Sequence, residues 1–315
     1  MPELYHILPV FNQRLYGGHD LSKRYGFVTD LANIGECYNV IAMPGHLDCI
    51  VCETGEKLSS FYQNNQELFG SNTPTMPVRA AMANTISPMS VQLHPSDAYA
   101  LAHDGRLGKP DGVYFIGGKS TMELGHYAKT REEFKKKVEN EDWEHLLRYV
   151  DCEAGQFVDV PYGTLHAFGG GLTLIEFSQN ADLTYRLYDY NRIDPQTGKT
   201  RELHIEKVLD CVNIPDQTID MVELYPYEKD GCQLTLFHDE PGVYTAGRIV
   251  VSGSGSFLLP EFYFLIGLCG SGKINGKNFK GGETLFVPCH YGPVQLQGNL
   301  EIGYLTFRQK EKSHG

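Results

Sequence analysis

The sequence has one tryptophan, no long apolar run and a deficit of positive charge. No stretch of about 18 apolar residues occurs, so no membrane-spanning helix and no membrane partner are expected. Lys and Arg number 27 against 39 Asp and Glu, which gives a formal net charge of −12. Because nucleic-acid binding needs clustered cations that neutralise phosphates, this balance argues against a nucleic-acid partner. A few local cations can still hold one small anion.

Signals for nucleotide binding and for secretion are also missing. No Gly-x-x-x-x-Gly-Lys-Ser/Thr motif occurs, so a nucleotide phosphate loop is not supported. The first residues show no basic segment followed by an apolar run, which predicts a cytoplasmic location. The eight cysteines are scattered through apolar segments and are expected to be reduced and buried. Cys49 and Cys52 have redox or zinc spacing, but no second pair and no following helix supports that function.

The residues that are present predict a mostly β chain. Of 315 residues, 41% are hydrophobic and 34 are glycine, which is enough for a real core and favours short strands joined by turns. Helical segments are expected near residues 56–70, where Gly70 ends the pattern, and near 130–149, where Thr130 and Glu133 form a capping box. The stretch between about 190 and 225 is expected to be irregular.

The C-terminal part repeats the preceding part in outline. Residues 281–288 resemble residues 155–161, since both run from glycine through an apolar strand to proline. We therefore expect two units, at residues 1–220 and 221–315. The second unit has His290 after its proline but no Gln-x-His partner, so no metal site is expected there and His290 is interpreted as structural.

Four side chains form a candidate metal site. Gln92 and His94 are two residues apart, so on a strand both side chains point to one face. His166 follows a second strand, and Asp111 supplies a carboxylate between them. An amide, two imidazoles and a carboxylate suit one Zn²⁺ or a similar divalent ion with an open coordination position. Either histidine alone is more simply a surface or core residue, and it is the combination that favours a metal.

These residues also carry a family resemblance. The segments 92–95 (QLHP), 163–167 (GTLHA) and 176–189 (EFSQNADLTYRLYD) resemble the type I phosphomannose isomerases, in particular their short bacterial form. The resemblance covers roughly residues 8–215 and becomes weaker beyond them. Any one of these motifs is weak by itself, but the ordered set is specific.

The resemblance implies a fold, an activity and a set of site residues. The fold would be two cupin-type jelly rolls with a small helical insertion. The activity would be a metal-dependent interconversion of mannose 6-phosphate and fructose 6-phosphate through an enediolate, with one Zn²⁺ or other divalent ion per chain. Lys109 and Arg186 match family active-site residues and are the candidate catalytic groups. Apart from the resemblance, a phosphate needs cations or hydrogen-bond donors, and Ser90, Lys109 and Arg186 are the candidate substrate contacts for it. From its pattern alone, Arg186 could equally be a surface residue paired with a nearby aspartate.

The sequence departs from the family at one ligand. Asp111 stands where the family normally has glutamate, and Gly112 and Val113 replace bulkier residues. A shorter carboxylate reaches less far, and glycine lets the backbone adjust. A catalytically weak cupin that binds or senses a sugar phosphate is therefore the alternative. The general base stays open among several groups, including Glu36 and His94.

Overall fold

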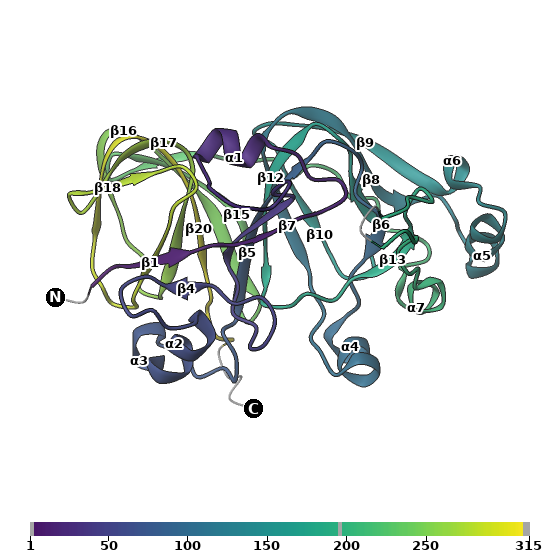
Figure 1. The fold of residues 1–315 in the computed structure, drawn as a ribbon, viewed down its shortest axis with the longest axis horizontal. Helices are drawn as coiled ribbons and strands as arrows, with labels where there is room; N and C mark the ends of the chain where they lie inside the picture. The colour runs from purple at the N-terminus through teal and green to yellow at the C-terminus, as the bar shows by residue number, and fades with distance from the viewer. Residues whose placement is uncertain (1–2, 195–196, 311–315) are drawn as a thin grey trace.

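The computed structural model describes residues 3–194 and 197–310, and strands dominate it (Figure 1). Two sheets build the half of the molecule that holds the candidate site. The six-stranded sheet runs in the order β10-β7-β12-β5-β3-β2 and the five-stranded sheet in the order β13-β6-β11-β8-β9. Their strands are β2 (Val10–Asn12), β3 (Glu36–Val40), β5 (Val78–Thr85), β6 (Val91–Leu93), β7 (Asp111–Gly117), β8 (Lys119–His126), β9 (Leu147–Glu153), β10 (Phe157–Val160), β11 (His166–Phe168), β12 (Leu172–Gln179) and β13 (Tyr185–Tyr188).

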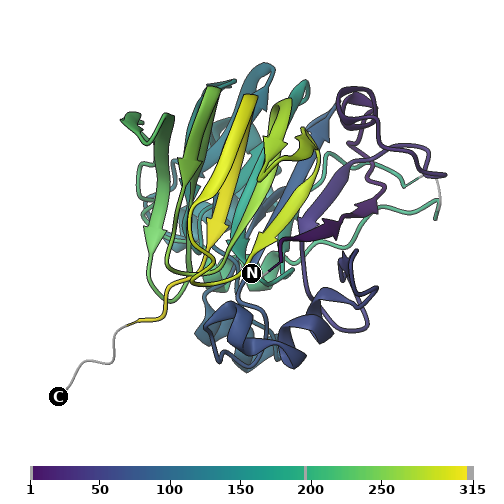
Figure 2. The same cartoon turned by 90° about the vertical axis from the view of Figure 1, so that its left-hand side faces the viewer.

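The remaining sheet has nine strands and forms the other half. Its long strands lie side by side, with the helices α2 and α3 below them (Figure 2). The strands are β1 (Tyr5–Leu8), β4 (Ile50–Val51), β14 (Tyr227–Lys229), β15 (Cys232–Glu240), β16 (Tyr244–Phe257), β17 (Tyr263–Ile274), β18 (Lys277–Lys280), β19 (Thr284–Val287) and β20 (Val294–Thr306). The mostly β, double jelly-roll fold expected from the sequence is confirmed.

Helices lie at the edges of the sheets. They are α1 (Asp20–Tyr25), α2 (Leu58–Asn64), α3 (Gln66–Phe69), α4 (Asp97–Asp104), α5 (Arg131–Glu139), α6 (Trp143–Leu146) and α7 (Ile205–Cys211). Helices α5, α6 and α7 lie at the end of the molecule far from the nine-stranded sheet (Figure 1). Among the helices of the described residues, none combines the length and the apolar character that a membrane crossing requires.

The helical predictions near 56–70 and 130–149 hold, with one difference at the end of the second range. Thr130 caps the helix, since its hydroxyl accepts from the Glu133 backbone N–H at 3.1 Å. The Glu133 carboxylate accepts from the Lys129 backbone N–H at 2.8 Å instead of that of Thr130, so the expected capping box is only half formed. Residues 147–149, however, are strand rather than helix, because β9 pairs with β8 in the five-stranded sheet. The expectation of irregular structure over 190–225 was also wrong in part. Helix α7 forms there because it buries Val208 and Leu209 in the core beside β6 and β13.

The two halves share one hydrophobic core. Phe177 of β12 and Phe237 of β15 belong to the same buried cluster, together with Tyr244 of β16. Strand β1 pairs with β19, so the start of the chain belongs to the sheet built mainly from the C-terminal part. The boundary near residue 220 therefore stays a prediction from the sequence, and the core around Phe177 is continuous across it.

Candidate metal centre

The metal ligands predicted from the sequence stand at strand ends of the first jelly roll. His94 comes directly after β6, Asp111 opens β7 and His166 opens β11. Strands β6 and β11 are neighbours in the five-stranded sheet, with Gln92 opposite His166. Strand β7 belongs to the six-stranded sheet that faces them. The cluster thus joins the two sheets, and it forms only when both are assembled.

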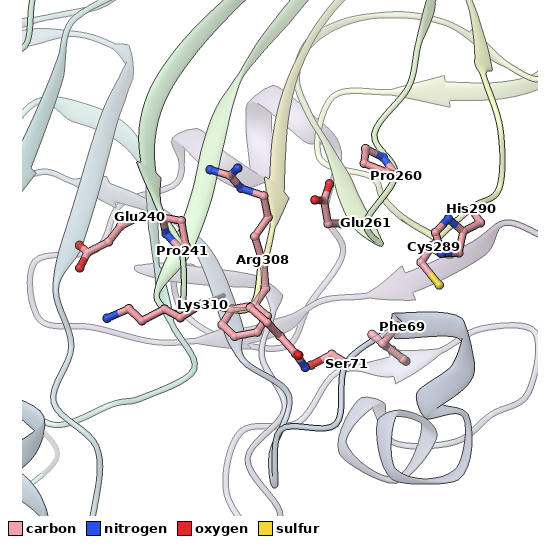
Figure 3. Close-up of a pocket in the computed structure, with 13 residues that line it drawn as sticks. Phe69, Ser71, Glu240, Pro241, Pro260, Glu261, Cys289, His290, Arg308 and Lys310 are labelled. Atoms are coloured by element: carbon pink, nitrogen blue, oxygen red, sulfur yellow. The ribbon is translucent and has the colours of Figure 1, made fainter. Parts of the chain in front are cut away.

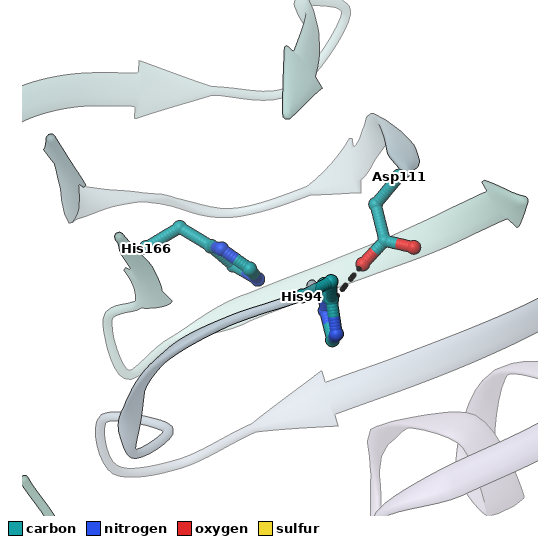
Figure 4. A group of neighbouring side chains, drawn as sticks. All are labelled: His94, Asp111 and His166. Atoms are coloured by element: carbon teal, nitrogen blue, oxygen red, sulfur yellow. Dashed lines mark ion pairs between the residues drawn. The ribbon is translucent and has the colours of Figure 1, made fainter. Parts of the chain in front are cut away.

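Three of the four predicted ligands meet inside the protein. Ligand atoms of His94, Asp111 and His166 all lie within 4.8 Å of one another, and each residue is at most 2% exposed. Their side chains point toward one another (Figure 4), and His94 Nε2 lies 3.0 Å from Asp111 Oδ2. Two imidazoles and a carboxylate are a common ligand set for a divalent transition metal.

The hydrogen bonds of the two histidines fix which ring nitrogen is free. His94 Nδ1 lies 2.8 Å from the Leu183 carbonyl oxygen, and His166 Nδ1 lies 3.1 Å from that of Thr164. A carbonyl can only accept, so each Nδ1 carries the proton when the ring is neutral. Each Nε2 is then left with its lone pair. Both Nε2 atoms, and Asp111 Oδ1, are buried without a hydrogen-bond partner among the described residues. Such unpaired buried acceptors fit a cation.

The electrostatics of the cluster favour the metal-binding protonation states of His166 and Asp111. Burial lowers the pKa of His166 to about 3, and the adjacent His94 contributes to this shift. Burial alone would raise the pKa of the Asp111 carboxyl, but the Lys109 ammonium and the His94 ring lower it well below its usual range. A neutral imidazole and an ionised carboxylate are the forms that bind a metal ion.

A buried ion-pair network supports Asp111 from one side. Lys109 Nζ donates to Asp111 Oδ2 at 2.7 Å and to Glu176 Oε1 at 2.8 Å. Arg79 also donates to Glu176, and its side chain is almost fully buried on β5. We did not predict roles for Arg79 or Glu176 from the sequence. The signal that could have found them was the arginine near the start of β5, a strand that is mostly apolar, because a buried charge requires a partner.

A cavity of about 340 Å³ lies beside the metal cluster, and the other predicted site residues form part of its wall. Ser90, Gln92, Lys109 and Arg186 all line it. The Arg186 Nε donates to Ser90 Oγ at 3.2 Å, and the Ser90 hydroxyl donates to Gln92 Oε1 at 3.3 Å. This chain of hydrogen bonds holds the arginine next to the amide on β6. The volume lies within the range of about 300–1,000 Å³ typical of small-molecule sites.

Arg186 does not form the surface ion pair with a nearby aspartate that its sequence pattern allowed. Its guanidinium bonds to two neutral oxygens, Ser90 Oγ and, at 2.9 Å, the Glu202 carbonyl. The nearby Asp189 is instead paired with Arg192 and Arg201. Burial lowers the pKa of Arg186, and the neighbouring Arg201 lowers it further. A half-buried cation that has no carboxylate partner favours the binding of an anionic ligand beside it.

A larger hollow lies elsewhere, between α3 and the ends of β15 and β20 (Figure 3). It has a volume of about 850 Å³ and includes Cys289 and Glu261 in its lining. Its other polar groups include Arg308, which is paired with Asp239. None of the site residues predicted from the sequence is part of this lining, and the unpaired ligand atoms lie in the first jelly roll.

Comparison with known proteins identifies the family. The chain is 35% identical over 306 residues to the probable mannose-6-phosphate isomerase GmuF of Bacillus subtilis, covering 93% of this chain and 96% of the relative. It is 33% identical to the mannose-6-phosphate isomerase of Streptococcus mutans, covering 92% and 94%. The chain belongs to the mannose-6-phosphate isomerase family. No family model matches it.

Solved mannose-6-phosphate isomerase structures agree with this assignment. The crystal structure of the Bacillus subtilis enzyme superposes with a TM-score of 0.92 at 26% identity, covering 97% of this chain and all of that one. The apo enzyme of Salmonella typhimurium shares the fold, with a TM-score of 0.76 at 13% identity and coverage of 98% and 100%. Another mannose 6-phosphate isomerase with a TM-score of 0.76 is bound with zinc and yttrium, at 13% identity and coverage of 97% and 99%.

In this member of the mannose-6-phosphate isomerase family, a tyrosine from the second jelly roll packs beside the candidate metal ligands. Gly112 follows Asp111 directly, and a Cβ on it would lie 2.5 Å from the Tyr244 hydroxyl and 2.7 Å from Phe157 Cζ. Tyr244 lies at the start of β16 and is fully buried. Tyr244 thus occupies the space that a side chain at position 112 would need. Strand β7, which carries Asp111, therefore packs directly against the other half of the molecule.

Proposed function

We propose that this protein is a metal-dependent aldose–ketose isomerase that interconverts mannose 6-phosphate and fructose 6-phosphate. The observation that carries the proposal is the pair of buried, unpartnered Nε2 atoms of His94 and His166 beside the Asp111 carboxylate. Membership of the mannose-6-phosphate isomerase family supports the substrate, since the named relatives match over more than nine-tenths of this chain.

His94, Asp111 and His166 would hold the metal, and Gln92 would be the fourth ligand. The donor set suits Zn²⁺ as well as other divalent ions, and zinc is favoured because a structural relative binds it. The metal, when bound, supplies Lewis acidity toward a sugar oxygen. The Gln92 amide could turn toward the cluster without breaking a hydrogen bond to the backbone, because in the part of the chain that the structure describes only the Ser90 hydroxyl bonds to its oxygen. The metal would then lie in the unit that we assign to residues 1–220.

The cavity residues would then act on the substrate. Moving a proton between C1 and C2 of a sugar puts negative charge on the two neighbouring oxygens, and this charge must be stabilised away from water. Arg186 can supply that stabilisation, because it faces the cavity without a carboxylate partner. Lys109 contacts Asp111 directly and lines the same cavity, so it would orient the carboxylate and contact the sugar.

Glu36 also lines the cavity, but its environment makes it a poor general base. Burial alone would raise its pKa, yet the Arg14 guanidinium and the hydroxyls of Tyr38 and Tyr16 lower it to about 2. A base this weak holds a proton poorly at neutral pH, so proton transfer by Glu36 is disfavoured. Its role is better described as holding Arg14, whose Nη2 lies 2.7 Å from Glu36 Oε2.

The proposal is tested by a coupled assay of mannose 6-phosphate turnover with added Zn²⁺ or Co²⁺, together with metal analysis of the purified protein. We expect turnover and one divalent ion per chain. His94→Ala should abolish both turnover and stoichiometric metal, whereas the matched control His145→Ala should change neither, since His145 is exposed and remote from the cluster.

Saturable binding of mannose 6-phosphate without turnover by the metal-loaded protein would contradict the enzyme and favour a sugar-phosphate sensor. Wild-type metal content in His94→Ala would contradict the assigned ligand. Turnover that persists in that variant without any metal would contradict the metal-dependent mechanism.

A further inference from the structure

The cavity next to the metal cluster is rich in cations although the chain as a whole is acidic. Three carboxylates line the cavity, in a chain whose net charge is −12. The six cationic side chains in its lining are Arg14, Arg79, Arg106, Lys109, Arg186 and Arg201. An excess of positive charge inside a cavity favours an anionic ligand.

Four of these six cations already form ion pairs with carboxylates of the protein. Arg14 pairs with Glu36 and Arg79 with Glu176. Lys109 lies between Asp111 and Glu176. Arg201 Nη2 lies 2.6 Å from Asp189 Oδ1. These four cations shape the cavity wall, and they leave Arg106 and Arg186 for a ligand.

The two remaining guanidinium groups occupy different places. Arg186 is half-buried and is tied to Ser90, next to Gln92 and therefore at the metal end of the cavity. Arg106 is exposed and lines both this cavity and an adjoining groove, so it stands at the rim. Within residues 3–194 and 197–310, its guanidinium makes no ion pair and no hydrogen bond.

The segment that carries Arg106 is held firmly on both sides. Gly108 N donates to Asp97 Oδ1 at 2.9 Å, and Gln179 Nε2 donates to the Gly108 carbonyl at 2.5 Å. A Cβ on Gly108 would lie only 2.0 Å from the Pro95 carbonyl oxygen, so the backbone packs tightly at this point. A short, fixed segment therefore connects the rim cation Arg106 to the buried carboxylate of Asp111.

We propose that Arg106 binds the phosphate group of the substrate at the cavity rim and sets the preference for phosphorylated over unphosphorylated hexoses. This inference rests on the proposed function, because the reacting carbons C1 and C2 must lie near the metal cluster. The phosphate on C6 is then at the opposite end of the sugar, toward the rim. Guanidinium groups recognise phosphate oxygens through paired charge-assisted hydrogen bonds.

The test compares wild-type protein with Arg106→Gln, both loaded with metal. We expect the KM for mannose 6-phosphate to rise about 10- to 100-fold with kcat within a fewfold of wild type, since a charge-assisted contact to a non-reacting group contributes equally in the ground and transition states. The ratio of kcat/KM for mannose 6-phosphate to that for mannose should fall by the same factor. Arg106→Lys should recover part of the loss.

Arg131→Gln is the matched control, because Arg131 is an exposed arginine on α5 that pairs with Asp210 away from the cavity. It should leave KM unchanged. An unchanged KM in Arg106→Gln, or an equal loss with mannose and mannose 6-phosphate, would overturn the role of Arg106.

Calorimetric titration with inorganic phosphate separates this inference from the proposed function, because it needs no turnover. The wild-type protein should bind phosphate, and Arg106→Gln should bind it at least tenfold more weakly. Loss of phosphate binding in Arg106→Gln together with an inactive wild type would refute the isomerase and retain the anion site. Equal phosphate binding by both proteins would refute the anion site at Arg106, whatever the activity.

Discussion

At the scale of single residues, the site depends on which charged groups lack a partner. Within residues 3–194 and 197–310, no donor bonds to the buried Nε2 atoms of His94 and His166, and the half-buried Arg186 guanidinium bonds only to neutral oxygens. Buried polar groups in a folded protein are normally satisfied. Their convergence on one region is therefore better explained by a metal and an anionic ligand than by stability.

Arg186→Ala should lower kcat by about 10²–10³-fold while leaving metal content near that of the wild type, because the side chain faces substrate charge and does not contact the histidines. Steady-state kinetics and metal analysis measure the two effects separately. Arg192→Ala is a suitable comparison, since Arg192 is paired with Asp189. Wild-type turnover in Arg186→Ala would make Arg186 a purely structural residue.

At the scale of elements, the metal cluster depends on contacts between strands that are distant in sequence. Asp111 opens β7 in the six-stranded sheet, whereas His94 and His166 adjoin β6 and β11 in the other sheet. Strand β16 of the second jelly roll then packs its Tyr244 over Gly112. The position of Asp111 is thus set jointly by both halves of the molecule.

Gly112→Ala should reduce the free energy of unfolding by about 1–3 kcal/mol, since the added methyl overlaps Tyr244 and Phe157 in a closed core. Urea denaturation measures this loss. Metal affinity should fall as well, because the neighbouring Asp111 must move with the strand.

Tyr244→Phe in the Gly112→Ala background supplies the control for that prediction. The Tyr244 hydroxyl lies 2.5 Å from the position that the added Cβ would take, so removing this hydroxyl should restore part of the stability. The wild type, the two single variants and the double variant form a double-mutant cycle. Strictly additive effects of the two substitutions would contradict a direct contact between Tyr244 and position 112.

At the scale of the whole molecule, global stability should depend on pH through Glu36. The pKa of this carboxyl falls from 4.5 to about 2 on folding, so the folded state favours the ionised form. The contribution of Glu36 to the free energy of unfolding is present above pH 4.5. It is lost as the pH falls toward 2, because the unfolded chain then binds the proton more readily than the folded chain. The full shift corresponds to stabilisation on the order of 3 kcal/mol.

Glu36→Gln should therefore be less stable than the wild type near neutral pH, and the difference should shrink as the pH falls from 4.5 toward 2. Urea denaturation at a series of pH values measures the difference directly. A difference that stays constant over this range would show that ionisation of Glu36 does not contribute to stability.

The shared core limits how independent the two halves can be. Phe177, Phe237 and Tyr244 lie in one buried cluster, and β1 pairs with β19. Strand character and the helical segment near 130–149 follow from local periodicity and capping, and the structure confirms the mostly β fold and places α5 and α6 within that segment. The strand at 147–153 and helix α7 were not predicted, because pairing with β8 and burial of Val208 decide them and neither is visible in the local pattern.

The sequence by itself determined the mostly β fold and the ligand candidates Gln92, His94, Asp111 and His166, because strand alternation and motif order are local properties of the chain. Only the tertiary structure decided that three of these ligands converge, that Lys109 and Arg79 share Glu176, and that Arg106 stays unpaired among the described residues. The physical reason is that charge pairing depends on distances between strands and loops far apart in sequence, and only the register of the assembled sheets sets those distances.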